Sequence, residues 1–356
     1  MMRRVLTILL AVAALRPAAA VNVLYRESFD NGTGGWTNAN PNGPAPTFSN
    51  LIAHQGSALE CWYDLPDAAH PFILAKPEPP SLAGARSLRF WLRTSQPAII
   101  VVHLSKANGA GYETAVFTAA ATWQHVELSL DRFRLSQDSD DPDGHLDPAQ
   151  IVHIALIDAS RVIPLPTNDV VHRGLWLDEF QVDDQDCLTA YSTKGQLPFI
   201  LENFQEDALS WTVGWGRLEH DLKAGEIVWH CPKDKPATGF PGLLGLLGQL
   251  PSKGPRSLIV TLQCSQTRKL AFLLQQQKRH NQPELNYHLI KDVTASERPT
   301  SFVLSLSDFA QNDNDPVQPL DLSKVSLFIV LDIDAAQGKA DADNDLRLSE
   351  LVLTSK

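Results

Sequence analysis

The most informative candidate binding residue is a tryptophan with an arginine two positions to either side. In the run 87–93, three apolar residues alternate with Arg89, Trp91 and Arg93. Such alternation is typical of a β-strand with one face toward a core, so the indole and both guanidinium groups are predicted to point outward. An outward indole stacks on the apolar face of a ring such as a sugar, while charged neighbours bind hydroxyl groups. We therefore expect a ligand-binding face at Trp91, with packing of the ring under a loop as the alternative.

Two further residues extend this candidate face. His103 has the outward parity in the strand predicted over 99–105, which we expect to neighbour the Trp91 strand. Trp176 has the same parity in the last predicted strand of this half of the chain. Trp36 and Trp211, in contrast, occupy one matching position in the two halves and are predicted to be core or edge anchors.

Three acid-rich segments are candidates for cation binding, at residues 138–144, 312–316 and 341–345. None matches an EF-hand calcium loop, which needs acids at alternate positions, Gly at the sixth position and Glu at the twelfth. Counted from Asp341, for example, the twelfth residue is Val352. We interpret the three segments as solvated turns, with a weak accessory cation as the alternative.

The sequence contains no recognisable catalytic motif. Its 11 histidines lack His-x-His and His-Glu-x-x-His spacing, and there is no Gly-x-Ser-x-Gly elbow, phosphate-binding loop or glycosidase pair of acids. We therefore predict that the protein is not an enzyme. The alternative is a polysaccharide lyase, in which five side chains would have to converge: Arg89, Arg93, His103, Tyr112 and His125.

Charge and composition limit the classes of partner. The 356 residues include 30 basic and 41 acidic side chains, a formal net charge of −11. Without the first 20 residues, which hold three arginines and no acid, 27 basic and 41 acidic residues leave a net charge of −14. So acidic a surface argues against nucleic acid or an anionic membrane as the main partner.

Residues 1–20 have the pattern of a signal peptide, with basic residues, an apolar run of 11 residues and small residues before a predicted cleavage after Ala20. The run is shorter than the roughly 20 residues that span a membrane, and no later stretch reaches that length. We therefore expect an exported protein, secreted, periplasmic or at the cell surface, without a transmembrane segment.

The four cysteines leave the redox state open. Cys61, Cys187, Cys231 and Cys264 are not at metal-site spacing. An oxidising compartment allows three full pairings, and buried free thiols are the alternative.

Internal self-similarity divides the chain. The segment Gly84–Leu88 returns as Gly254–Leu258, a shift of 170 positions, and Glu27–Phe29 returns as Glu202–Phe204. Further matches follow in the same order. We predict two tandem copies, which we name module 1 (residues 21–185) and module 2 (residues 198–356), joined by a linker at 186–197.

Within both modules the apolar period is mostly two. Strand candidates in module 1 are separated by turn-forming Pro, Gly, Asn and Asp, and no segment has the pattern of a long amphipathic helix. The prediction is an all-β fold of two tandem jelly-roll β-sandwiches.

We interpret the Leu-rich segment Phe240–Leu250 as a loop that folds back on the sandwich, with an exposed contact surface as the alternative.

The order of motifs resembles galactose-binding-domain-like jelly rolls, a group that includes many non-catalytic carbohydrate-binding modules. The residues that carry the resemblance are Glu27-Ser-Phe29, the strand Ser87–Leu92, the strand Trp123–Leu130 and the closing strand Leu175–Phe180. The same fold also serves protein docking and structural support, so the resemblance does not fix the function.

The resemblance also implies a structural calcium ion. In module 1 the matching ligands are Glu27 and Asp178, with Asp30 as a possible extra oxygen donor. Calcium takes six to eight oxygens, so backbone carbonyls would have to complete the shell. Module 2 has Glu202 but carries Ser349 where module 1 has Asp178, which argues against a second site.

Taken together, these features predict an exported, non-catalytic protein that binds a polysaccharide or other glycan through module 1. Module 2 has Thr261 and Arg347 at the positions that match Trp91 and Trp176, so we expect its face to be poor in aromatic residues. The alternative is a cell-surface or envelope scaffold that binds other proteins.

Overall fold

The computed structural model describes residues 21–162, 170–187, 196–205, 209–234, 239–277, 284–313 and 315–356. The predicted signal peptide and most of the predicted linker lie outside these ranges. The described chain is almost entirely antiparallel β-structure, and its α-helix is the short α1 (Ile333–Ala336). The predicted all-β class is therefore confirmed.

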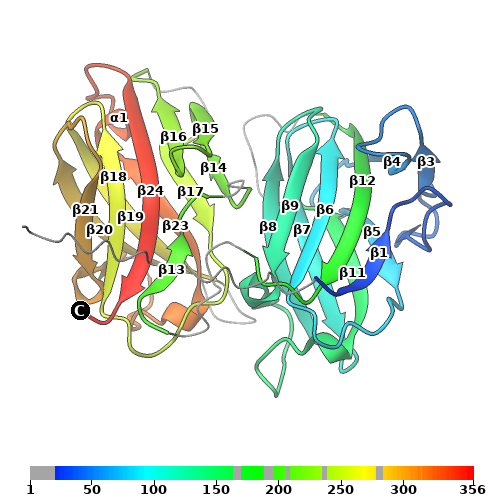
Figure 1. Cartoon of the computed structure of the whole chain (residues 1–356). Coiled ribbons are helices and arrows are strands. Elements are labelled where there is room, and N and C mark those ends of the chain that lie inside the picture. Colours follow the sequence, from blue (N-terminus) through cyan, green and yellow to red (C-terminus); the bar gives the residue numbers. More distant parts are fainter. Residues whose placement is uncertain are drawn as a thin grey trace, which may run out of the picture.

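The first half of the chain forms two six-stranded sheets that pack face to face (Figure 1). Sheet A has the order β3-β4-β12-β6-β9, with β1 also paired to β12. Its strands are β1 (Val23–Glu27), β3 (Thr47–Ser49), β4 (Ala58–Asp64), β6 (Ser87–Thr94), β9 (Gln124–Ser129) and β12 (His172–Asp183). Sheet B has the order β10-β8-β7-β11-β5-β2. Its strands are β2 (Thr37–Asn38), β5 (Phe72–Pro77), β7 (Ala98–Lys106), β8 (Gly111–Thr118), β10 (Arg134–Leu135) and β11 (Ile151–Asp158).

The second half also forms two six-stranded sheets. Sheet C has the order β15-β16-β24-β18-β21, with β13 also paired to β24, and sheet D has the order β14-β17-β23-β19-β20-β22. The strands of sheet C are β13 (Phe199–Glu202), β15 (Arg217–Asp221), β16 (Glu226–Cys231), β18 (Ser257–Cys264), β21 (Thr300–Ser305) and β24 (Asn344–Thr354). The strands of sheet D are β14 (Trp211–Val213), β17 (Gly242–Leu246), β19 (Arg268–Gln276), β20 (Leu285–Val293), β22 (Ala310–Gln311) and β23 (Val325–Asp332). Four 3₁₀ turns complete the described elements: η1 (Leu130–Arg132), η2 (Pro148–Gln150), η3 (Leu306–Asp308) and η4 (Leu322–Lys324).

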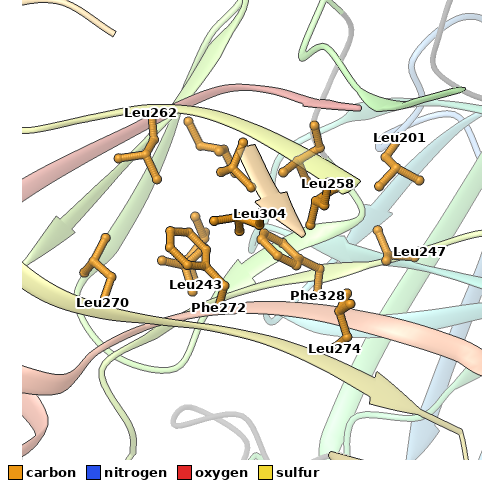
Figure 2. Packing of buried hydrophobic residues seen from close by; sticks show 14 of the residues in the cluster. Leu201, Leu243, Leu247, Leu258, Leu262, Leu270, Phe272, Leu274, Leu304 and Phe328 are labelled. Atoms are coloured by element: carbon orange, nitrogen blue, oxygen red, sulfur yellow. The ribbon is translucent and has the colours of Figure 1, made fainter. Parts of the chain in front are cut away.

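Alternation of apolar residues builds the cores. In β6 every second residue is fully buried, and the inward side chains of sheet A meet those of sheet B in one cluster. Sheets C and D enclose a second cluster, in which Phe272 and Phe328 interdigitate with leucines from both sheets (Figure 2). Trp36 and Trp211 are almost completely buried in the two clusters, as predicted.

The Leu-rich segment is not a loop, which corrects the sequence-based interpretation. Residues Gly242–Leu246 form β17, which pairs with β14 and β23 inside sheet D. Its glycines admit neighbouring rings, because a Cβ at Gly245 would lie 2.5 Å from the Trp211 indole. Most of the segment is consequently buried, and Phe240 at its start is 39% exposed.

The two halves contact each other through buried polar groups. The guanidinium group of Arg134 on β10 donates hydrogen bonds to the carbonyl oxygens of Gly248, Ser323 and Val325 in the second half. The backbone N–H of Phe117 on β8 donates to the carbonyl of Leu209 over 2.6 Å. A cation is thus solvated by the backbone of the opposite half rather than by water.

We expect Arg134→Met to lower the free energy of unfolding by about 1.5–3 kcal/mol, the range for hydrogen bonds to a charged group. The buried carbonyls lose their donor, so the contact between the halves weakens. Urea unfolding followed by tryptophan fluorescence measures the change. Arg217→Met is the control, because that exposed side chain pairs with Glu219 at the surface and its replacement should cost less than about 0.5 kcal/mol. Equal effects of the two variants would contradict the proposed role of Arg134.

Candidate ligand-binding face

The outer face of sheet A gathers aromatic side chains from adjacent strands and from the loops beside them. Across the register, Trp176 on β12 pairs with Glu60 on β4 and with Arg93 on β6, and Trp91 on β6 pairs with Asp178 on β12. We call this surface the aromatic face. Its aromatic residues are Trp62, Trp91, Trp123, Trp176, His54, His125 and His172.

Trp91 lies on the outer face, as its parity predicts, but its ring is not free. The imidazole of His54 stacks on the indole with the ring centroids 3.7 Å apart and the planes 11° from parallel. His125 on β9 contacts the same indole at 5.1 Å in a tilted arrangement. Trp91 is therefore half-buried, and the loop that carries His54 covers part of the predicted stacking surface.

Two acids, the buried Asp178 and the exposed Asp30, hold this loop in place. The backbone N–H groups of His54 and Gln55 both donate to Oδ2 of Asp178 over 2.9 Å, and the N–H of Ser57 donates to Oδ1 of Asp30 over 3.0 Å. The Asp178 side chain is fully buried, and burial raises its pKa although the backbone hydrogen bonds oppose the shift. Asp178 thus positions His54 above Trp91.

This arrangement does not fit the calcium ion that the family resemblance implies. Asp178 accepts three backbone N–H groups, the third from Glu179 over 2.8 Å, and these donors point positive dipoles at the oxygens a cation would need. Within the described part of the chain, no group of three or more His, Cys, Asp or Glu side chains is arranged to hold a metal. Calcium binding is implied by the resemblance alone, and the contacts of Asp178 argue against it.

The first-strand glutamates act within the fold in both halves. Oε1 of Glu27 accepts the N–H of Phe29, a residue held at a φ of 60°. Glu202 accepts the N–H of Phe204 in the same way, and its Oε2 also accepts the indole N–H of Trp211 over 3.2 Å. These carboxylates stabilise a left-handed residue that most side chains disfavour.

Trp62 is an exposed tryptophan on the face, beside the exposed rings of His54 and His172, and the sequence analysis missed it. Trp62 is 42% exposed, whereas Trp176 is 3% exposed and contacts Trp62 edge to face at 5.2 Å. Oε1 of Glu60 accepts both indole N–H groups over 3.0 Å. Gly174 lies opposite Trp62, and a Cβ there would come within 2.6 Å of the Trp176 ring, so glycine leaves the space that both indoles fill. The outward parity of Trp62 in the run 58–64 was the available signal.

The arginines that flank Trp91 have different surroundings. Arg89 forms ion pairs with Glu127 and with the buried Asp183, and these hydrogen bonds raise its pKa although desolvation lowers it. Arg93 lies over the ring of Trp176, 5.7 Å from the centroid. Arg89 is therefore a structural ion-pair partner, and Arg93 is the arginine of the aromatic face.

His103 is not on this face, which corrects the sequence-based grouping. The chain passes from sheet A to sheet B between β6 and β7, so the outward side of β7 is the opposite surface of the sandwich. There His103 lies 3.9 Å from Glu113. Tyr112 points inward and is buried. The five residues considered for a lyase therefore do not converge.

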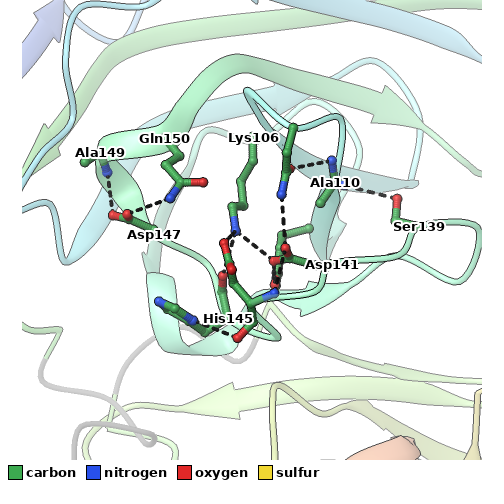
Figure 3. Close-up of polar contacts among 12 residues, drawn as sticks. Lys106, Ala110, Ser139, Asp141, His145, Asp147, Ala149 and Gln150 are labelled. Atoms are coloured by element: carbon green, nitrogen blue, oxygen red, sulfur yellow. Dashed lines mark hydrogen bonds and ion pairs between the residues drawn. The ribbon is translucent and has the colours of Figure 1, made fainter.

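The first acid-rich segment is a largely exposed loop with turns, as predicted, but the side chain of Asp141 within it forms a buried ion pair (Figure 3). The ammonium group of Lys106 on β7 lies 2.8 Å from Oδ2 of Asp141 and 3.3 Å from Oδ2 of Asp143, and the side chains of Lys106 and Asp141 are fully buried. Tyr112 donates to Asp141 over 2.5 Å. Hydrogen bonds from Lys106 and then Tyr112 hold the pKa of Asp141 well below its usual range. A lysine thus supplies the cation that the acids of this loop bind.

The cysteines Cys61, Cys231 and Cys264 are buried and carry free thiols. Burial raises the pKa of Cys61, Cys231 and Cys264 to about 12. These thiols are therefore protonated and unreactive at neutral pH.

No family model matches the sequence, and no curated protein matches it. Solved structures with a similar fold include the family 11 carbohydrate-binding module of the Clostridium thermocellum cellulase Lic26A-Cel5E, with 12% identity, 45% of this chain and 95% of that chain covered, and a TM-score of 0.34. TmCBM61, solved with beta-1,4-galactotriose, has 17% identity, coverage of 44% and 92%, and a TM-score of 0.28. A non-crystalline cellulose specific module, CBM28, has 14% identity, coverage of 44% and 90%, and a TM-score of 0.30. Sequence identities and TM-scores this low do not assign a function to the chain.

Among the described residues, no helix is long and apolar enough to cross a membrane.

We expect Asp141→Asn to lower the free energy of unfolding at neutral pH by about 3–5 kcal/mol, because a buried ammonium group loses its main partner. The pKa of Asp141 is lowered in the folded state, so its contribution is present above the ordinary value of 3.8 and is lost as the pH falls below it. The variant should therefore lose less stability than the wild type on acidification. Urea unfolding over a pH series measures both effects. Asp143→Asn is the control, since that side chain is 51% exposed; identical pH profiles for wild type and Asp141→Asn would refute the assignment.

Because backbone N–H groups surround Asp178, we expect the melting temperature to be the same in calcium and in chelator. Scanning calorimetry of the wild type in both conditions tests this. A bound ion would instead stabilise by about 2.7 kcal/mol at a hundredfold excess over its Kd. Such a rise, absent in Asp178→Asn, would restore the calcium hypothesis.

Proposed function

We propose that the protein is an exported, non-catalytic binding protein that recognises a carbohydrate through the aromatic face of module 1. The observation that carries the proposal is the concentration of four tryptophans and three histidines on one face of sheet A, next to charged groups. Rings for stacking beside hydrogen-bonding side chains are the combination that sugar recognition requires.

The second half of the chain offers an internal comparison. The strands β16, β24 and β18 of sheet C stand in the same order as β4, β12 and β6 of sheet A. The outer positions that hold tryptophans in module 1 hold other residues in module 2. By register, His230 replaces Trp62, Arg347 replaces Trp176 and Thr261 replaces Trp91. Sheet C forms ion pairs there, including Arg347 with Glu226. The sandwich does not need aromatic residues on its outer face, so their presence in module 1 supports a binding role.

We expect wild-type protein to bind at least one class of glycan on an array, and Trp91→Ala to weaken that binding by about 10- to 100-fold, the range for truncating an interface aromatic. The ring is half-buried beneath His54, so the melting temperature should also fall modestly. Arg347→Ala, on the equivalent face of module 2, is the control and should leave binding unchanged. If the wild type binds no glycan, the carbohydrate proposal fails in favour of the scaffold alternative.

A further inference from the structure

The aromatic face contains a cation without an anion. Arg93 is half-buried over Trp176, and its Nε is inaccessible to solvent without a hydrogen-bond acceptor. No carboxylate among the described residues forms an ion pair with it. Arg89, two residues earlier on the same strand, contacts two carboxylates. A partly desolvated guanidinium group lacking its counter-ion is unfavourable, and an incoming anion relieves that cost.

The nearby acids are already engaged. Oε1 of Glu60 accepts the N–H groups of Trp62 and Trp176, and Asp64 contacts Nδ1 of His172 over 2.9 Å. Neither carboxylate forms an ion pair with Arg93 among the described residues. The guanidinium group is therefore available to an external carboxylate, for which its planar fork of donors is suited.

An exposed indole lies beside this cation. Trp62 is 42% exposed and is stacked with His172 at 5.3 Å with planes 10° apart, which fixes the indole in place. Trp62 and Arg93 are separated by two strand spacings and two residues along the strand, roughly 12 Å between Cα atoms. Both side chains border the buried ring of Trp176, which closes the gap between them.

We propose that the aromatic face binds a glycan chain that carries carboxylate groups, with one sugar ring stacked on Trp62 and a uronate carboxylate paired with Arg93. This rests on the proposed carbohydrate-binding function and names its ligand class. It also adds Trp62 as a stacking ring beside Trp91, part of whose ring His54 covers.

The test compares two ligands that differ only in charge: an oligogalacturonate, and the same oligosaccharide with its carboxyl groups reduced to alcohols. Calorimetric titration at physiological salt is suitable, because the net negative charge of the protein is then screened beyond about 8 Å. We expect wild type to bind the acidic oligosaccharide at least tenfold more tightly. Arg93→Gln should remove this preference, and Arg93→Lys should retain part of it.

Trp62→Ala should weaken binding of both oligosaccharides about equally, and Trp62→Phe should restore much of the affinity, which separates stacking from folding. Arg26→Gln is the matched control, because Arg26 is exposed on sheet A and pairs with Glu179. Equal affinity of wild type for the two ligands, or a preference that survives Arg93→Gln, overturns the uronate proposal while the general carbohydrate proposal stands. Failure to bind any glycan on the array overturns both.

Discussion

The hydrogen-bonded register of β12 is the constraint on which the aromatic face depends. This strand is central in sheet A and pairs with β1, β4 and β6. Because side chains alternate along a strand, that register sets Trp176 between Glu60 and Arg93 and sets Asp178 beside Trp91. A slip of one residue would turn these groups into the core and the core leucines outward. The buried apolar face of β12 therefore determines the geometry of its exposed face.

Asp178 shows how a buried charge organises a surface. Transfer of a carboxylate out of water is costly unless hydrogen bonds replace the lost solvation. Three backbone N–H groups supply those bonds, and two of them belong to the loop that presents His54. The loop conformation above Trp91 and the ionisation of Asp178 are consequently linked. Lys106 and Asp141 apply the same principle on the other sheet, where each charge replaces the water of its partner.

The two halves show which residues the fold requires and which it leaves open. Each half keeps a first-strand glutamate that caps a left-handed phenylalanine, and each buries a tryptophan nine residues after that glutamate. The outer faces differ: module 1 carries indoles where module 2 carries an ion pair of Arg347 with Glu226. Core positions are constrained by packing, whereas outer positions are free to acquire a ligand. The contacts of Arg134 join the two sandwiches through backbone carbonyls of the second half.

The sequence alone determined the features that follow from local periodicity. Alternation predicted the strands, the all-β class and the outward direction of Trp91, because the pleat of a strand fixes side-chain parity without reference to distant residues. The matching positions of Trp36 and Trp211 in the two halves predicted that they are core or edge anchors. Strand partners come from pairings between distant residues, so the tertiary structure decided that His103 lies on the opposite sheet, that the Leu-rich segment is a strand and that Lys106 fills the acidic loop. It also decided that His54, 37 residues before Trp91, covers part of that ring, while Trp62 is 42% exposed beside His172. Strand alternation predicts that a side chain points away from the core. Only the tertiary packing determines whether that side chain then contacts solvent, a loop or another charged group.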